Sequence, residues 1–243
     1  MRRLVTVVVV AAMMIGLSGC GRQVTGLNAG GGGIVPAGET AIRFDTVGPL
    51  DFQNVSYLIV LNTTGNGQQP YALGYNTDFK NWSAFFIVGG GAGYANFPGL
   101  LQVYQDPASG AARTFNVPIP NGTVNFNPTV PTGNGFQITF NRCIVDLAPP
   151  TASPPPPVSS NKDCPPYTNI NKVWQVSLFT LDRTQSPVDS LSSNGASNTD
   201  YKFPNNGLDT SQTITTLNFF KQGNQQVSNP SAQIAGVEVF NTP

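Results

Sequence analysis

Short runs of alternating apolar and polar residues, separated by turn-forming residues, are the feature that most limits how this chain can fold. The chain has 243 residues, of which 26 are glycine and 21 are proline. A period of two indicates β-strands, because successive side chains of a strand point to opposite faces. Glycine, proline and asparagine between the runs supply turns. No pattern after residue 20 indicates a helix of about ten residues or more, so the chain is predicted to be all-β.

One of the predicted strands is apolar on both faces. Asn54–Asn62 places Tyr57 and Ile59 on one face and Leu58 and Val60 on the other. This pattern suits a central strand that is covered on both sides. Lys172–Asp182 is the clearest strand of the second half of the chain. Further strands are expected at Thr40–Thr46, Ser83–Val88, Leu100–Gln105, Thr114–Ile119, Thr123–Asn127, Phe136–Phe140, Thr213–Phe220 and Gln233–Phe240.

This series of short strands favours an antiparallel β-sandwich or a Greek-key barrel-like domain, which we assign to residues 39–243. Residues 148–157 read APPTASPPPP and cannot join the interior of a sheet. They are expected to form a protruding loop, with an interdomain linker as the alternative. Residues 183–209 are polar and are expected to form loops with at most one short strand, near Tyr201–Phe203.

The first twenty residues, MRRLVTVVVVAAMMIGLSGC, have the layout of a secretory signal. Two arginines precede an uncharged apolar run, and small residues follow it. The run from Leu4 to Gly19 is shorter than the roughly 20 apolar residues that a membrane-spanning helix needs. An uncleaved anchor, and ordinary secretion with a chance cysteine at position 20, stay open as alternatives.

The cysteine placed directly after Leu17-Ser18-Gly19 resembles the lipobox of bacterial lipoproteins. The resemblance covers this segment only. It implies that residues 1–19 are a cleaved signal peptide and that Cys20 becomes an acylated N-terminus, carrying diacylglyceryl and palmitate chains. Two or three acyl chains hold a protein stably on a membrane. Gly21 after the cysteine implies, by the same resemblance, the outer membrane if the organism has one. Residues 20–38, which include four consecutive glycines, are expected to form a flexible tether.

Composition excludes several classes of function. The chain has no histidine, which removes the commonest general base and the commonest zinc ligand. Its formal net charge is zero and only 10% of its residues are charged, against a typical value of about 25%. Such a chain is not expected to bind nucleic acid. We therefore expect no enzyme, no metal and no cofactor, and we assign no catalytic residue.

Two cysteines remain when Cys20 is lipidated. In an exported protein Cys143 and Cys164 are expected to pair, with a free thiol as the alternative. The loop of about 22 residues that they close, which contains the polyproline segment, corresponds to roughly 3 kcal/mol in the chain-entropy treatment.

Other local motifs are weaker. The Gly89–Gly93 run GGGAG does not fit the dinucleotide pattern G-x-G-x-x-G and is interpreted as a wide loop between strands. Asp200–Asp209 is interpreted as a turn and not as a calcium loop. Trp82 and Tyr75 flank a polar turn and are the residues most expected to be exposed, as a platform on which a sugar could stack.

The sequence thus predicts an exported protein that is anchored to a membrane through a lipid. Its expected role is that of a structural or interaction module at the cell envelope. A surface carbohydrate-binding module and an accessory subunit of an envelope complex are the alternatives. The partners expected are the membrane, and envelope proteins or glycans.

Overall fold

The computed structural model describes the chain in several ranges. These are residues 35–36, 38–63, 70, 81–91, 93–105, 112–119, 121–128, 134–145, 173–191, 202–204, 212–215 and 227–241. The chain divides into two compact units, Met1–Ile34 and Val35–Pro243. All described residues belong to the second unit, and the fold reported below is the fold of that unit.

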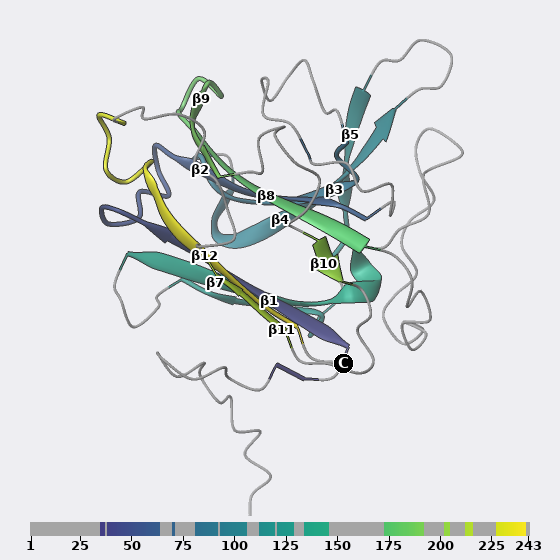
Figure 1. The fold of residues 1–243 in the computed structure, drawn as a ribbon. Helices are drawn as coiled ribbons and strands as arrows, with labels where there is room; N and C mark the ends of the chain where they lie inside the picture. Colours follow the sequence, from purple (N-terminus) through teal and green to yellow (C-terminus); the bar gives the residue numbers. More distant parts are fainter. Residues whose placement is uncertain are drawn as a thin grey trace, which may run out of the picture. The chain divides into compact units, whose positions relative to one another are not determined.

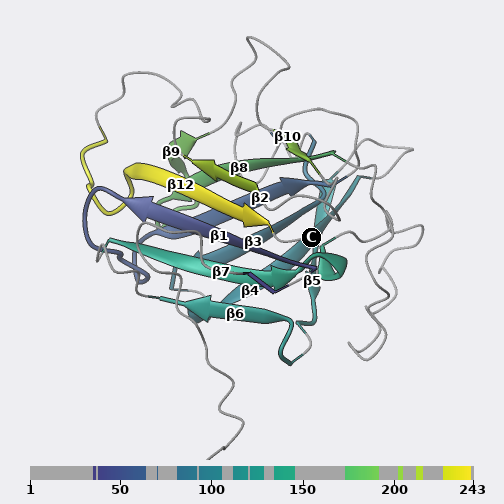
Figure 2. The same ribbon diagram turned by 60° about the horizontal axis from the view of Figure 1, so that its bottom comes forward.

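Two antiparallel sheets pack face to face as a β-sandwich (Figure 1). The first sheet has the strand order β11-β12-β1-β7-β6. Its strands are β1 (Glu39–Thr46), β6 (Val124–Asn127), β7 (Gly135–Asn141), β11 (Gln212–Thr215) and β12 (Ile234–Asn241). Figure 2 shows β12, β1, β7 and β6 side by side. The prediction of an all-β sandwich is confirmed.

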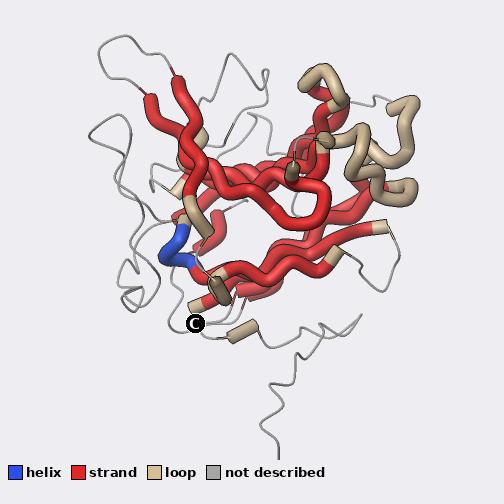
Figure 3. Tube along the Cα trace, turned by 180° about the vertical axis from the view of Figure 1, so that it is seen from behind, coloured by secondary structure: helices blue, strands red, loops and turns tan. Residues whose placement is uncertain are grey.

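The second sheet has the order β10-β8-β2-β3-β4-β5, and β9 also pairs with β8. Its strands are β2 (Ser56–Asn62), β3 (Ala84–Gly89), β4 (Tyr94–Gln105), β5 (Ala112–Val117), β8 (Val173–Leu181), β9 (Pro187–Leu191) and β10 (Lys202–Pro204). One short 3-10 helix, η1 (Arg142–Ile144), follows β7 and is the one helix among the described residues (Figure 3).

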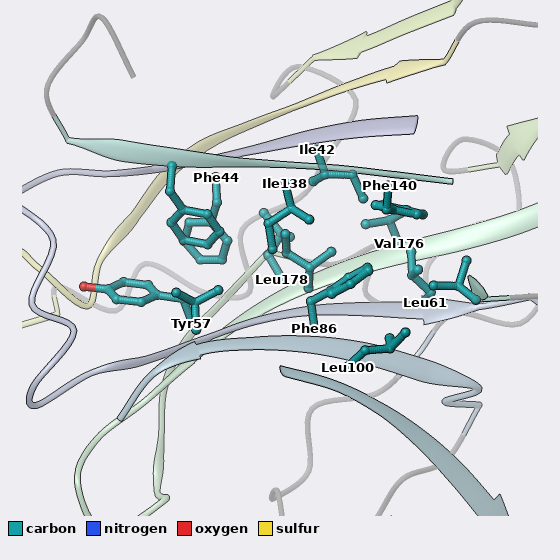
Figure 4. Close-up of a cluster of buried hydrophobic side chains, with 14 of the residues drawn as sticks. Ile42, Phe44, Tyr57, Leu61, Phe86, Leu100, Ile138, Phe140, Val176 and Leu178 are labelled. Atoms are coloured by element: carbon teal, nitrogen blue, oxygen red, sulfur yellow. The ribbon is translucent and has the colours of Figure 1, made fainter. Parts of the chain in front are cut away.

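The main hydrophobic core lies between the two sheets (Figure 4). From the first sheet, Phe44, Ile138 and Phe140 point toward the second sheet, from which Tyr57 and Phe86 point back. All five side chains are fully buried. At one end of the core the rings of Phe44 and Phe136 stack with their centroids 5.2 Å apart.

The second sheet also buries its outer face. Every residue of β2 is buried, and its side chains divide between two clusters as the alternation predicted. Tyr57, Ile59 and Leu61 join the main core, whereas Leu58 and Val60 join a second cluster on the outer face. That outer cluster consists of Leu58, Val60, Trp82, Phe85, Ile87, Leu101, Val103, Phe179 and Leu181. The prediction that β2 is covered on both sides is confirmed.

Two strands differ from the sequence expectation. β4 begins at Tyr94, six residues before the predicted start, and its register against β3 shifts between Ile87 and Gly89. This irregularity accommodates Pro98, because a proline is tolerated in a strand at a bulge. β9 lies in the stretch that was expected to hold at most one short strand, so that expectation is wrong. β9 forms in spite of its polar composition because it lies at the edge of the sheet, where Pro187 is tolerated as the first residue of the strand.

Tyr57 joins a loop to the start of β12 through its hydroxyl group. The hydroxyl accepts a hydrogen bond from the backbone N–H of Asp51 at 2.8 Å and donates one to the carbonyl of Ser231 at 3.0 Å. Burial raises the pKa of Tyr57 to about 12, and the nearby Asp51 carboxylate adds to the rise against the opposing hydrogen bond from its backbone.

We expect the free energy of unfolding of the Tyr57→Phe variant to decline less than that of the wild type as the pH rises through the alkaline range. An unfolded tyrosine has a pKa of about 10, so the stability due to the protonated hydroxyl is complete below pH 10 and declines as the pH rises through about 12. Two pKa units set an upper bound of about 3 kcal/mol on this decline. Urea unfolding at pH values from about 8 to 12 checks the prediction, which fails if both proteins lose stability in parallel.

Candidate functional site

Two acidic side chains meet around one arginine on the outer face of the first sheet. The Nε atom of Arg43 lies 2.9 Å from Oδ1 of Asp45, and its Nη1 atom lies 3.3 Å from Oε2 of Glu238. Arg43 and Asp45 are two residues apart on β1 and therefore share a face, and Glu238 lies opposite Arg43 on β12. This is the one place where ion pairs form among the described residues.

This cluster is suited to holding strands together and not to acid–base catalysis. Catalysis by paired carboxylates needs two groups whose environments drive their pKa values apart. Here Asp45 and Glu238 both contact the guanidinium of Arg43. Because the three groups belong to β1 and β12, they reinforce the pairing of these strands.

Asp189 is a buried carboxylate with a clear structural partner. Its Oδ2 atom accepts a hydrogen bond from the backbone N–H of Ile234 at 2.8 Å, at the first residue of β12. The hydroxyl of Thr180 on β8 donates to the carbonyl of Ala232 at 2.6 Å, just before the same strand. These two contacts join the second sheet to the start of β12, so Asp189 serves to fasten one sheet to the other.

Trp82 is not an exposed stacking platform. Its side chain is only 8% exposed. Its ring stacks on Phe179 with a centroid distance of 5.5 Å and an interplanar angle of 6°, and it meets Phe85 edge-on at 5.4 Å. The prediction that Trp82 faces solvent is wrong. Although a polar turn precedes Trp82, burying its ring against the apolar outer face of the second sheet is more favourable than leaving the ring in water. Trp174 on β8 is 1% exposed and belongs to the main core.

Several predicted site residues lie outside the described part of the chain. These are Tyr75, Cys20, Cys164, the polyproline segment 148–157 and most of Asp200–Asp209. Cys143 is described: it lies in η1, partly buried against the main core, and its N–H donates to Oδ1 of Asn141 at 3.1 Å. The pairing of Cys143 with Cys164 and the lipidation of Cys20 stay predictions.

The glycine run after β3 forms a tight turn against another loop. Gly89, Gly90, Gly91 and Gly93 all have positive φ. The N–H of Gly90 donates to the carbonyl of Val55 at 2.9 Å, and the N–H of Gly91 donates to the carbonyl of Phe52 at 3.3 Å. The turn therefore directs its N–H groups at its own chain, which supports the interpretation as a loop between strands and not as a phosphate cradle.

The described ranges contain no candidate metal site and no candidate membrane-spanning helix. No group of three or more acidic or cysteine side chains there could hold a metal ion. The same residues include no helix with the length and apolar character needed to cross a bilayer.

Comparison with known proteins does not assign a family. No protein-family model, no curated protein and no solved structure matches this chain.

The cluster of Arg43, Asp45 and Glu238 was not predicted from the sequence. The alternation in Thr40–Thr46 does place Arg43 and Asp45 on one face. The sequence holds no signal for Glu238, because the pairing of β1 with β12 joins residues 195 positions apart.

Proposed function

We propose that this chain is an exported lipoprotein that holds a β-sandwich at the cell envelope, where the sandwich acts as a structural or interaction module. The observation that carries the proposal is the sequence MRRLVTVVVVAAMMIGLSGC, in which a basic start and an apolar run lead to Cys20. Attachment through the acyl chains of Cys20 keeps the domain at the membrane without a spanning helix. The expected location is the outer membrane if the organism has one.

The character of the folded domain supports a binding or structural role over a catalytic one. The chain has no histidine. The two carboxylates that the described residues bring together share Arg43, and the buried Asp189 bonds to a backbone N–H. Each of these acidic groups has a role in joining strands.

The pairing of Cys143 with Cys164 belongs to the same proposal, because disulfides form in exported proteins. It is supported by the disulfide-bonded state of Cys143. The bond would hold the base of the loop that contains the polyproline segment.

Replacing Cys20 with alanine is expected to abolish lipid labelling and to release the protein from the membrane fraction. The full chain and the Cys20→Ala variant are expressed in a bacterial host with a clickable palmitate analogue, and the cells are fractionated. Cys143→Ala is the matched control and should keep the label, since it removes a cysteine but leaves the acylation position. Unlabelled wild-type protein in the soluble fraction would contradict the proposal.

A further inference from the structure

β5 forms one edge of the second sheet and is the longest strand at any end of either sheet. It has six residues, whereas β6 and β11 at the ends of the first sheet have four each and β10 has three. Within the described residues β5 pairs only with β4. The two strands extend together beyond their neighbours (Figures 1 and 3). A terminal strand presents N–H and C=O groups that can pair with another strand.

The hydrogen bonding of β4 fixes which groups of β5 point outward. The N–H of Val103 donates to the carbonyl of Ser83, on the β3 side, at 2.9 Å. In an antiparallel sheet the backbone groups of successive residues point alternately to the two neighbouring strands. Thr114 lies opposite Val103, so its own N–H and C=O point away from β4. The same holds for Ala112 and Asn116, two residues to either side.

Three features that often protect a sheet edge are absent from the interior of β5. Edges are commonly blocked by a proline, a bulge or an inward-pointing charge. β5 contains no proline, its register with β4 runs from Ala112 to Val117 without a shift, and its one charged residue, Arg113, is exposed. Asn116 is exposed as well. Within the described part of the chain, β5 therefore carries neither a proline, nor a bulge, nor an inward-pointing charge that would keep a second strand from pairing with it.

The order of residues in β5 is complementary to itself. When two β5 strands run antiparallel with Thr114 opposite Thr114, Ala112 lies opposite Asn116. Arg113 then lies opposite Phe115, twice by symmetry, and the two arginines do not face each other. A guanidinium beside an aromatic ring is attracted to it, and threonine pairs across strands are favourable. We propose that a second copy of this chain docks on β5 through its own β5 and continues the second sheet across a two-fold axis.

This dimer is expected to be weak. Six residues a side bury less than the roughly 800 Å² per partner that stable interfaces bury, so we expect dissociation constants in the micromolar to millimolar range. The inference goes beyond the proposed function and does not depend on the lipid, because the pairing is a property of β5 alone.

Cysteine cross-linking of the full chain in non-ionic detergent tests the register. The Thr114→Cys variant, oxidised with copper-phenanthroline, should form at least about ten times more disulfide-linked dimer than Asn125→Cys on the exposed edge strand β6, with the unsubstituted chain as background. Across a two-fold axis the two Cα atoms at position 114 lie about 5.5 Å apart, within the range of a disulfide. Ala112→Cys alone should not cross-link, because the two copies of position 112 lie more than about 13 Å apart. A mixture of Ala112→Cys and Asn116→Cys should cross-link.

Sedimentation of two further variants tests the backbone pairing. Thr114→Pro removes an outward N–H and should weaken the dimer by about tenfold or more, whereas Thr114→Val keeps the N–H and should dimerise like the wild type. The proposal is overturned if Thr114→Cys cross-links no better than Asn125→Cys, or if a folded Thr114→Pro variant dimerises normally. If Thr114→Pro does not fold, the cross-linking result decides.

Discussion

Replacing Gly89 with alanine is expected to lower the free energy of unfolding by about 3 kcal/mol or more. Gly89 has φ of 83°, a conformation that costs an L-residue roughly 1–2 kcal/mol. A Cβ atom there would also collide with the carbonyl oxygen of Val55. That oxygen cannot withdraw freely, because it accepts a hydrogen bond from Gly90 at 2.9 Å.

Gly122 is the matched control for this prediction. It has nearly the same φ, 82°, but apart from its two chain neighbours none of the described residues has an atom within 4 Å of the position of its Cβ. Gly122→Ala should therefore cost only the conformational part, roughly 1–2 kcal/mol. Urea unfolding followed by tryptophan fluorescence measures both variants, and equal losses would show that the contact between the two loops contributes nothing.

Truncating Phe136 to alanine is expected to cost about 3–5 kcal/mol of stability. Its ring is fully buried and lies within 6.4 Å, centroid to centroid, of four other rings. These rings are Phe44, Phe52, Tyr57 and Phe126. They come from both sheets and from the loop before β2, so the cavity left by Phe136 would lie where three parts of the fold meet.

Phe126→Ala gives the comparison. Phe126 belongs to the edge strand β6 and is only partly buried, although its ring contacts Phe52 and Phe136. Its loss should cost about half as much, because partial exposure lets solvent fill the space. The free energies of unfolding in urea decide between them, and a larger loss for Phe126→Ala would contradict this assignment of the core.

Alternation alone located most of the strands. Strands expected from Thr40–Thr46, Asn54–Asn62 and Phe136–Phe140 are present as β1, β2 and β7 with shifts of one or two residues. The two faces of β2 were also predicted correctly, because Leu58 and Val60 on one face are as apolar as Ile59 and Leu61 on the other. The alternation of apolar and polar residues did not reveal strands that contain a proline, namely the start of β4 and β9.

Side-chain exposure was harder to predict than strand position. Trp82 follows a polar turn, which predicted exposure, yet it lies against Phe179 from β8, nearly a hundred residues along the chain. The three groups of the Arg43 cluster were not brought together by any sequence signal. Both results depend on contacts between strands that are distant in sequence.

The sequence by itself determined the β class and the burial of β2 on both faces, and it predicts an anchor at Cys20. These are local properties, set by the period of two, by turn residues and by a signal that is recognised as a linear segment. Only the tertiary structure decided that β1 lies between β7 and β12, that Trp82 is buried and that β5 ends its sheet. The reason is that alternation specifies which face of a strand is apolar, whereas the partner of the strand depends on the packing of the whole domain.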